Sequence, residues 1–556
     1  MDNEKIRCAL MAGALMAATG VAACTNFIVG RGASADGSVM CTYSADDYGM
    51  FQELEHYPAA RHADGTMRTI TDWDTHVRHG EIPEAAVTYN VVGNINEWQV
   101  TIGETTFGGR EEMADTTGLV DYGSLMHIAL QRSRSAREAI DVMTSIAEQY
   151  GYCSEGETFT VCDASEAWIM EMMGCGVGSK SVVWVALRIP DNAICGHANQ
   201  SRIRTFDRTD TANVRCSDNV VAFARSKGWY TGADEDFSFC ETYAAPDFVG
   251  RRCCEARVWS FFNRFADGMN RYLPYVTGRE TDTEPLPLWI VPERKVSLAD
   301  MEAAMRDHYE GTPFALDSDI GGGIWEMPYR PTPLTFEHDS VTYFNERPTS
   351  TQQSGFVYVS QMRSWLPREI GGVLWFANDD SNMAPFTPVY CSATTVPTCY
   401  KTPGVDAVTF STDNAYWVCN WVSNMVYPRY SLMFPTLMAV RDSLDDSYME
   451  NQSGVEEHAR KLYDSDRDAV VAFLTHYGEE KASQMLSRWR QLAVFLIVKY
   501  NDMIIKPDTD GVFTRTDTGL GAKVVRPGYG ARFVNTYLNL TGDKFRVPEE
   551  EKKEGQ

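Results

Sequence analysis

The sequence predicts a mixed α+β fold, built as one unit with a helical C-terminal part. Short apolar runs separated by turn residues recur in the first half of the chain, which is typical of antiparallel strands. Apolar residues recur at helical spacing in one internal stretch and again near the C-terminus. The 556 residues are 44% hydrophobic and 23% charged and contain no evident repeat or linker, so we expect one large globular unit.

The first 23 residues have the composition of a secretion leader. Lys5 and Arg7 precede an apolar stretch from Ala9 to about Ala18, and small residues stand directly before Cys24. This stretch is too short for a membrane span and is typical of a signal peptide. We therefore expect residues 1–23 to be removed and the mature protein to be exported to the periplasm or the extracellular space of a bacterium.

Charge and cysteine spacing exclude several classes of function. With 50 basic and 76 acidic residues, the net charge of −26 argues against nucleic acid and against anionic membrane surfaces as partners. The 14 cysteines show no paired spacing typical of a zinc site, so we expect no metal and no cofactor. We also expect no membrane span; homo-oligomerisation and disulfide pairing stay open.

The mature chain opens with a predicted hairpin. Asn26–Gly30 is strand-like, Ala35–Gly37 is a turn signal, and Ser38–Tyr43 is the returning strand, with Asp46 at its end. A hairpin of this length returns Asp46 close to the beginning of the first strand.

The remaining elements follow from the same two periodicities. Two helices are expected between Leu125 and Tyr150, divided by a capping box that starts at Ser135, and Ser297 opens another over Val296–Tyr309. The predicted strands are Val87–Val92, Trp98–Ile102, Thr158–Cys162, Ala167–Met172, Val182–Ile189, Ile194–Ala198, Val341–Phe344, Gly355–Gln361, Gly372–Phe376 and Ala407–Phe410.

The C-terminal part is predicted to be helical. Leu, Val and Phe repeat on one face over Glu456–Tyr477 and Glu479–Tyr500, within a helical region that starts near residue 430. Residues 549–556 form a charged tail that we expect to be disordered. The predicted domain therefore covers residues 24–548.

A mature N-terminal Cys24 would carry a thiol and a free α-amine on neighbouring atoms. The amine, with a reference pKa of about 7.7–8, can act as a base, and the deprotonated thiol is a strong nucleophile. One residue can then supply both groups that acyl transfer requires.

Four blocks of the sequence follow one another in an order shared with a known family: Cys24–Gly30 with Ala33–Ser38, Asn94–Glu97 with Ile102–Thr106, His197–Gln200 with Arg202–Ile203, and Gln361–Trp375. Together they resemble the dipeptidase A/secernin family of N-terminal-nucleophile (Ntn) cysteine hydrolases. The resemblance covers most of the mature chain. It implies a four-layer αββα sandwich, with two antiparallel sheets between helix layers, and hydrolysis of short peptides without a metal.

Asp46 is the first candidate partner of Cys24. A carboxylate at this position could hold the α-amine and set its protonation, and the resembling family has an aspartate here. Asp47 is the competing choice. Many relatives carry an arginine three positions before the aspartate, whereas this chain has Tyr43, which can donate a hydrogen bond but cannot lower a thiol pKa by charge.

Two asparagines are the candidate amide groups of the site. Asn96 follows a predicted strand, and a neutral amide donor suits an oxyanion hole because it does not titrate. For Asn199, the resemblance implies an amide near the nucleophile, either as an orienter of the amine or as a second donor. His197 is the neighbouring alternative, but the α-amine makes a histidine base unnecessary.

Glu104 is the candidate group for substrate recognition. A dipeptidase must recognise free termini, and a buried carboxylate can pair with the α-ammonium of a short peptide. Tyr43 is placed with Glu104 as a candidate substrate-binding residue.

Two other functions compete with an exported dipeptidase. The first keeps the chemistry and changes the substrate, as in an amidase for N-acyl compounds of the bile-salt or penicillin type. The second is an envelope lipoprotein, lipidated at Cys24, that binds peptides without cutting them. The strand that begins directly after Cys24 leaves no tether for such an anchor and favours an enzyme.

Overall fold

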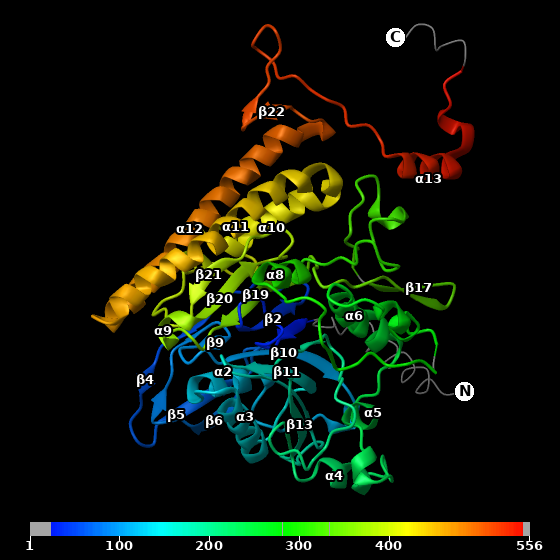
Figure 1. Ribbon diagram of the computed structural model, residues 1–556. Helices are drawn as coiled ribbons and strands as arrows, with labels where there is room; N and C mark the ends of the chain where they lie inside the picture. The colour runs from blue at the N-terminus through cyan, green and yellow to red at the C-terminus, as the bar shows by residue number, and fades with distance from the viewer. Residues whose placement is uncertain (1–23, 281, 333, 549–556) are drawn as a thin grey trace.

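The computed structural model describes residues 24–548 except 281 and 333 (Figure 1). The predicted leader, residues 1–23, and the predicted tail, residues 549–556, lie outside the described residues. None of the helices in the described part of the chain has the length and apolar character needed to cross a membrane.

Two large antiparallel sheets form the centre of the molecule (Figure 1). The first has seven strands in the order β16-β14-β1-β2-β19-β20-β21. Its strands, in chain order, are β1 (Asn26–Val29), β2 (Val39–Asp46), β14 (Ile194–His197), β16 (Trp289–Ile290), β19 (Ser354–Met362), β20 (Gly372–Asn378) and β21 (Thr387–Tyr390).

The second sheet has eight strands in the order β15-β13-β12-β11-β10-β9-β8-β3. Its strands, in chain order, are β3 (His56–Tyr57), β8 (Val91–Val92), β9 (Ile95–Asn96), β10 (Thr101–Gly108), β11 (Gly156–Cys162), β12 (Ala167–Gly174), β13 (Val182–Arg188) and β15 (Val214–Cys216).

The two sheets pack against each other through β1 and β2 on one side and β10 and β11 on the other. Gly103 on β10 permits the close approach, because a Cβ atom there would lie 2.4 Å from Asn26 Oδ1 and 3.1 Å from Tyr43 Cβ. His197, on β14 of the first sheet, also connects the two sheets through hydrogen bonds to Thr105 on β10 and Thr160 on β11. This arrangement of two packed sheets is compatible with a sandwich.

Helices cover the outer faces of both sheets. On the second sheet, α2 (Tyr122–Arg132) and α3 (Ala136–Tyr150) pack against β10, β11 and β13. They are separated at Ser135, whose side chain accepts the Glu138 N–H, whereas the Glu138 carboxylate accepts the N–H of Arg134, so half of the predicted capping box is formed. The helices packed on the first sheet are α6 (Ala256–Asn263), α8 (Leu298–Met305), α10 (Ala415–Val426), α11 (Tyr430–Tyr463) and α12 (Arg467–Tyr500).

The smaller elements lie around this centre. The two-stranded sheets pair β4 (Ala60–Arg61) with β7 (Val87–Thr88), β5 (Met67–Thr71) with β6 (Arg78–Pro83), β17 (Thr335–His338) with β18 (Val341–Phe344), and β22 (Asp508–Thr509) with β23 (Val512–Phe513). The short helices are α4 (Val220–Ser226), α5 (Phe239–Tyr243), α7 (Leu273–Val276), α9 (Arg368–Gly371) and α13 (Ala531–Thr541), and Gly250–Glu255 forms a π-helical turn before α6.

The break between the two long C-terminal helices differs from the prediction. It lies at residues 464–466, where Asp466 caps α12 by accepting the Ala469 N–H at 3.0 Å. Gly478, near the predicted break, lies inside α12, and a Cβ atom there would contact the Pro388 carbonyl oxygen on β21 at 3.5 Å. This glycine therefore lies within the helix, at a position where a Cβ atom would make an ordinary van der Waals contact with the sheet, and it does not end the helix.

Two other predicted strands are wrong in whole or in part. Ala407–Phe410 is a turn rather than a strand: Val408 is 90% exposed, and the Phe410 ring packs against Trp417 of α10. The stretch Val87–Val92 is divided between β7 and β8, which belong to different sheets. Short apolar runs at the surface cannot be distinguished from strands by their pattern alone.

Candidate active site

Cys24 lies at the beginning of the first hairpin and is 5% exposed. Thr25 and Ser44 exchange backbone hydrogen bonds, so the register of β1 and β2 brings the end of β2 to Cys24. The Cys24 thiol donates to Glu104 Oε1 at 3.5 Å. Burial, followed by the charges of Glu104 and Asp46, raises the pKa of the Cys24 thiol well above its ordinary value. The thiol is therefore protonated in the full-length chain.

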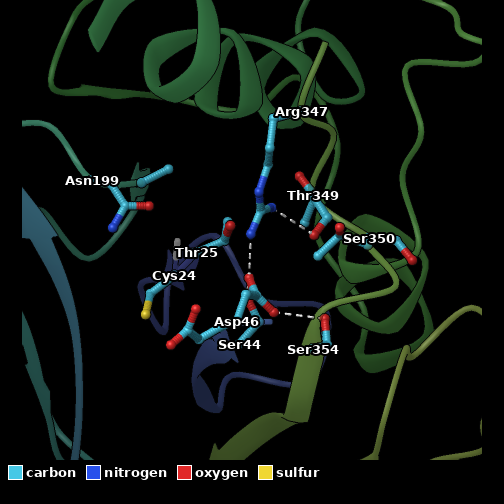
Figure 2. Close-up of polar contacts among 12 residues, drawn as sticks. Cys24, Thr25, Ser44, Asp46, Asn199, Arg347, Thr349, Ser350 and Ser354 are labelled. Carbon is cyan, nitrogen blue, oxygen red and sulfur yellow. Dashed lines mark hydrogen bonds and ion pairs between the residues drawn. The ribbon is translucent and has the colours of Figure 1, made fainter. Parts of the chain in front are cut away.

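Asp46 is the last residue of β2 and is almost completely buried. Its Oδ2 accepts Ser44 Oγ at 2.8 Å and Arg347 Nη2 at 2.5 Å, and its Oδ1 accepts Ser354 Oγ at 2.6 Å (Figure 2). The competing Asp47 is half-buried, and within the described part of the chain its carboxylate accepts a local bond, from the Tyr48 N–H. The structure thus brings Asp46, and not Asp47, into the polar network beside Cys24.

Arg257 on α6 binds the chain on both sides of Cys24. It is 0% exposed, and its five N–H groups meet five acceptors: Cys253 O at 2.9 Å, Cys24 O at 2.7 Å, Thr25 Oγ1 at 2.8 Å, Ala198 O at 3.1 Å and Asn199 Oδ1 at 3.0 Å. This is the full donor capacity of a guanidinium group. Arg257 therefore fixes the nucleophile and the loop after β14 relative to each other.

Arg347 donates to the carboxylate of Asp46, as a dashed line in Figure 2 shows. Its Nη1 donates to the carbonyl oxygens of Pro348 and Thr349 at 2.6 and 3.2 Å. Neither Arg257 nor Arg347 was among the residues that the sequence predicted. They stand 233 positions from Cys24 and 301 positions from Asp46, and no local pattern distinguishes them from other arginines.

Asn199 follows β14, and Figure 2 shows it above Cys24. Its φ of 60° is left-handed, a region that asparagine tolerates better than most residues. Oδ1 accepts the Arg257 bond, and Nδ2 donates to Thr106 O at 2.8 Å. The amide predicted for the site is thus held beside Cys24 by Arg257.

Tyr43 and Glu104 join the site from β2 and β10. The Tyr43 hydroxyl donates to Glu104 Oε1 at 2.6 Å, so the two candidate substrate-binding residues meet at the same oxygen as the Cys24 thiol. Burial raises the pKa of Glu104, and burial together with the charge of Glu104 raises the pKa of Glu157 well above its ordinary value. The two buried carboxyl groups therefore oppose each other's ionisation.

Asn96 does not belong to this network. Its Nδ2 donates to Leu130 O at 2.7 Å and Ser133 O at 2.9 Å, and its Oδ1 accepts the N–H groups of Trp98 and Val100. The two donor bonds use both amide hydrogens, so none is left for an oxyanion. The oxyanion role expected for Asn96 is therefore corrected to a structural one, which fixes the β9–β10 turn against α2.

His197 is also structural. Its two ring nitrogens bond to Thr105 Oγ1 at 2.8 Å and Thr160 Oγ1 at 2.7 Å, which ties β14 to β10 and β11 across the sandwich. Burial lowers the pKa of His197 well below its ordinary value, so the ring is neutral.

The sequence is similar to that of one family of peptidases. The sequence model of peptidase family C69 matches residues 23–442, a match that begins one residue before Cys24. The chain is similar to a probable dipeptidase of Salmonella dublin, with 28% identity over 391 residues that cover 66% of this chain and 81% of the relative. It is also similar to a probable dipeptidase of Latilactobacillus sakei, with 24% identity over 485 residues (83% and 92%), and to dipeptidase A of Lactobacillus helveticus, with 23% identity over 417 residues (71% and 80%).

Proposed function

Because the chain belongs to peptidase family C69 and is a cysteine-type peptidase, we propose that it is an exported dipeptidase with Cys24 as N-terminal nucleophile. Removal of residues 1–23 would free the Cys24 α-amine within the network of Asp46, Asn199 and Arg257. The observation that carries this proposal is the saturated bonding of Arg257 to both sides of Cys24. Such bonding orders the residue as a positioned group and does not suit the start of a flexible lipid tether. On this proposal, the two packed sheets and their helices form the αββα sandwich of Ntn hydrolases.

The reaction we propose is acyl transfer through a thioester. The α-amine of Cys24 takes the thiol proton, and the thiolate attacks the peptide carbonyl to form the C–S bond. The resulting ammonium gives its proton to the leaving amine as the C–N bond breaks. Water then loses a proton to the same amine and attacks the thioester, which releases the acid and restores the thiol.

Asp46 is the proposed partner of the Cys24 α-amine. A carboxylate has about four acceptor positions, and Asp46 accepts three bonds, from Ser44, Ser354 and Arg347. One position therefore remains for the ammonium form of the amine, and the three existing bonds fix the carboxylate in place.

Asn199 replaces Asn96 as the proposed oxyanion donor, because it is the amide that lies beside Cys24. Asn199→Asp preserves the size, the tolerance of a left-handed φ and an oxygen for Arg257, but removes the amide donor. We expect kcat for dipeptides to fall by about 10²- to 10³-fold, with KM changed little. Steady-state kinetics checks this, and an unchanged kcat would remove Asn199 from the mechanism.

Glu104 is the proposed partner of the substrate α-ammonium, because its buried carboxyl group meets both the Cys24 thiol and the Tyr43 hydroxyl. Glu104→Gln should raise KM for dipeptides by about 10- to 100-fold, the value of a charged hydrogen bond. N-acetylated dipeptides, which lack the ammonium, are the matched substrates and should show no such rise. An equal effect on both substrate classes would contradict this assignment.

The same carboxyl group predicts a pH dependence of KM. Burial raises the pKa of Glu104, so its anion is lost as pH falls through that raised value and KM rises. Above about pH 8 the substrate loses its own ammonium proton and KM rises again. The hydrogen bond from Tyr43 lowers the pKa of Glu104, so Tyr43→Phe should move the acid limb of the KM profile to higher pH. An acid limb that does not move would show that Tyr43 has no part in substrate binding.

Amino-acid release from a panel of dipeptides, measured beside hydrolysis of bile-salt and penicillin amides, tests the proposed substrate class. We expect cleavage of dipeptides, in line with the names of the related proteins. Cleavage of the N-acyl amides alone would favour the amidase alternative. Peptide binding without cleavage by a chain lipidated at Cys24 would favour the lipoprotein.

A further inference from the structure

Three metal-binding side chains meet outside the active site, between the β5–β6 hairpin and the beginning of α2. Asp72 and His79 lie at the two sides of the hairpin tip, and Asp121 is the N-cap residue of α2. One potential ligand atom from each of the three lies within 4.8 Å of the other two. Asp72 Oδ2 and His79 Nε2 are 3.9 Å apart, within the roughly 4.2 Å that two atoms, each about 2.1 Å from one cation, can span, and a small side-chain movement would bring them to the roughly 3.4 Å of a tetrahedral site.

Asp121 provides an independent sign that a ligand is missing from this cluster. Its side chain is almost completely buried, and its Oδ1 accepts the backbone N–H groups of Ser124 at 3.0 Å and Trp73 at 3.3 Å. Its Oδ2 is buried and has no hydrogen-bond donor among the residues that the structure describes. A buried carboxylate oxygen without a partner is costly, and a cation bound beside it would remove that cost.

The other two side chains are oriented so that each keeps one atom for a cation. Asp72 Oδ1 accepts the N–H and the hydroxyl of Thr75, both at 2.7 Å, which leaves Oδ2 on the side of His79. His79 Nδ1 lies 3.6 Å from Cys153 Sγ, which leaves Nε2 on the side of Asp72. Contacts of this kind, made by the second atom of a ligand group, orient metal-binding side chains in proteins.

We propose that Asp72, His79 and Asp121 bind a divalent first-row transition-metal cation that fastens the β5–β6 hairpin to α2. One imidazole nitrogen with two carboxylates suits Zn²⁺ or Mn²⁺ better than Ca²⁺, which takes six or more oxygen ligands. The hairpin tip already contacts α2 on both sides of this cluster. The Trp73 ring stacks on His127 with centroids 4.7 Å apart, and the Tyr122 hydroxyl donates to Asp74 Oδ1 at 2.8 Å. The three ligands are dispersed over positions 72, 79 and 121, so no short motif marks them in the sequence.

Mn²⁺ is the probe for this site, because it prefers oxygen and imidazole ligands and binds thiols weakly. The full chain, freed of metals by dialysis against a chelator, is titrated with Mn²⁺ while free Mn²⁺ is followed by electron paramagnetic resonance. We expect one saturable site. His79→Ala and Asp72→Asn should each weaken Mn²⁺ binding by at least about tenfold, and Mn²⁺ should raise the Tm of the parent chain but not that of His79→Ala.

Glu81→Gln is the matched control, because it removes a carboxylate from the same hairpin but from the exposed pair with Arg78. It should bind Mn²⁺ as the parent does. His79 is partly exposed, so its alanine variant should fold and keep the test valid even if Asp72→Asn does not. The absence of a saturable Mn²⁺ site in the parent, or equal binding by the parent and His79→Ala, would overturn the proposal. Neither outcome bears on the role of Cys24, which is tested by peptide hydrolysis.

Discussion

Cys24→Ala is expected to abolish the release of amino acids from dipeptides while leaving the fold intact. The substitution removes the only atom that can form the proposed thioester, so kcat should fall by at least about 10⁴-fold. Little should change in packing, because the thiol is small and its hydrogen bond to Glu104 is long at 3.5 Å. Chromatographic detection of free amino acids measures the loss.

The control for Cys24→Ala is Cys399→Ala. Cys399 is equally buried, at 4% exposed compared with 5% for Cys24, but it lies beside α12 and away from the first hairpin. The Cys399→Ala variant should retain full dipeptide turnover, and its Tm should be comparable with that of Cys24→Ala. Normal dipeptide hydrolysis by Cys24→Ala would rule out the thiol as nucleophile.

Arg257→Lys is expected to reduce both stability and activity, although it keeps the positive charge. Lysine has three donors where arginine has five, and it cannot reach acceptors on both sides of Cys24 in one plane. At least two buried acceptors would lose their partner, at about 1–3 kcal/mol each in the free energy of unfolding. Because Arg257 positions Cys24 and Asn199, kcat should fall more than KM rises.

Arg264→Lys serves as the matched control for this substitution. Arg264 directly follows α6 and is partly exposed, with an ion pair to Asp307. The Arg264→Lys substitution should lower the free energy of unfolding by much less than Arg257→Lys does, and it should leave kcat near that of the parent. A variant Arg257→Lys with parental kcat and Tm would show that the bonds of Arg257 do not order the site.

Local patterns predicted the parts of the site that are close in sequence. The apolar runs around a turn signal predicted the first hairpin, and the hairpin alone brings Asp46 to Cys24 through the Thr25–Ser44 pairing. The same kind of pattern predicted the helix start at Ser135. These features depend on interactions between residues near one another in the chain, which single-sequence reasoning can follow.

The cationic groups of the site could not be predicted in this way. Tyr43 brings no positive charge to the site, and the positive charges beside Cys24 and Asp46 come from Arg257 and Arg347, which only the tertiary fold brings near. For Asn96, the local sequence pattern was present but did not distinguish a catalytic role from a structural one. Its loop position fitted an oxyanion donor and a turn residue equally well, and only its hydrogen bonds to α2 and to its own turn decide between them.

If the active protein begins with a free Cys24, its N-terminal sequence and its intact mass will show this. The chain should be purified after export from a bacterial host, with peptide hydrolysis assayed on the same sample. We predict a terminus at Cys24, the mass of the unmodified chain from residue 24 onward, and hydrolysis only in samples with that terminus. Full activity with Met1 retained, or a lipid-sized mass increase on a blocked Cys24, would contradict the account.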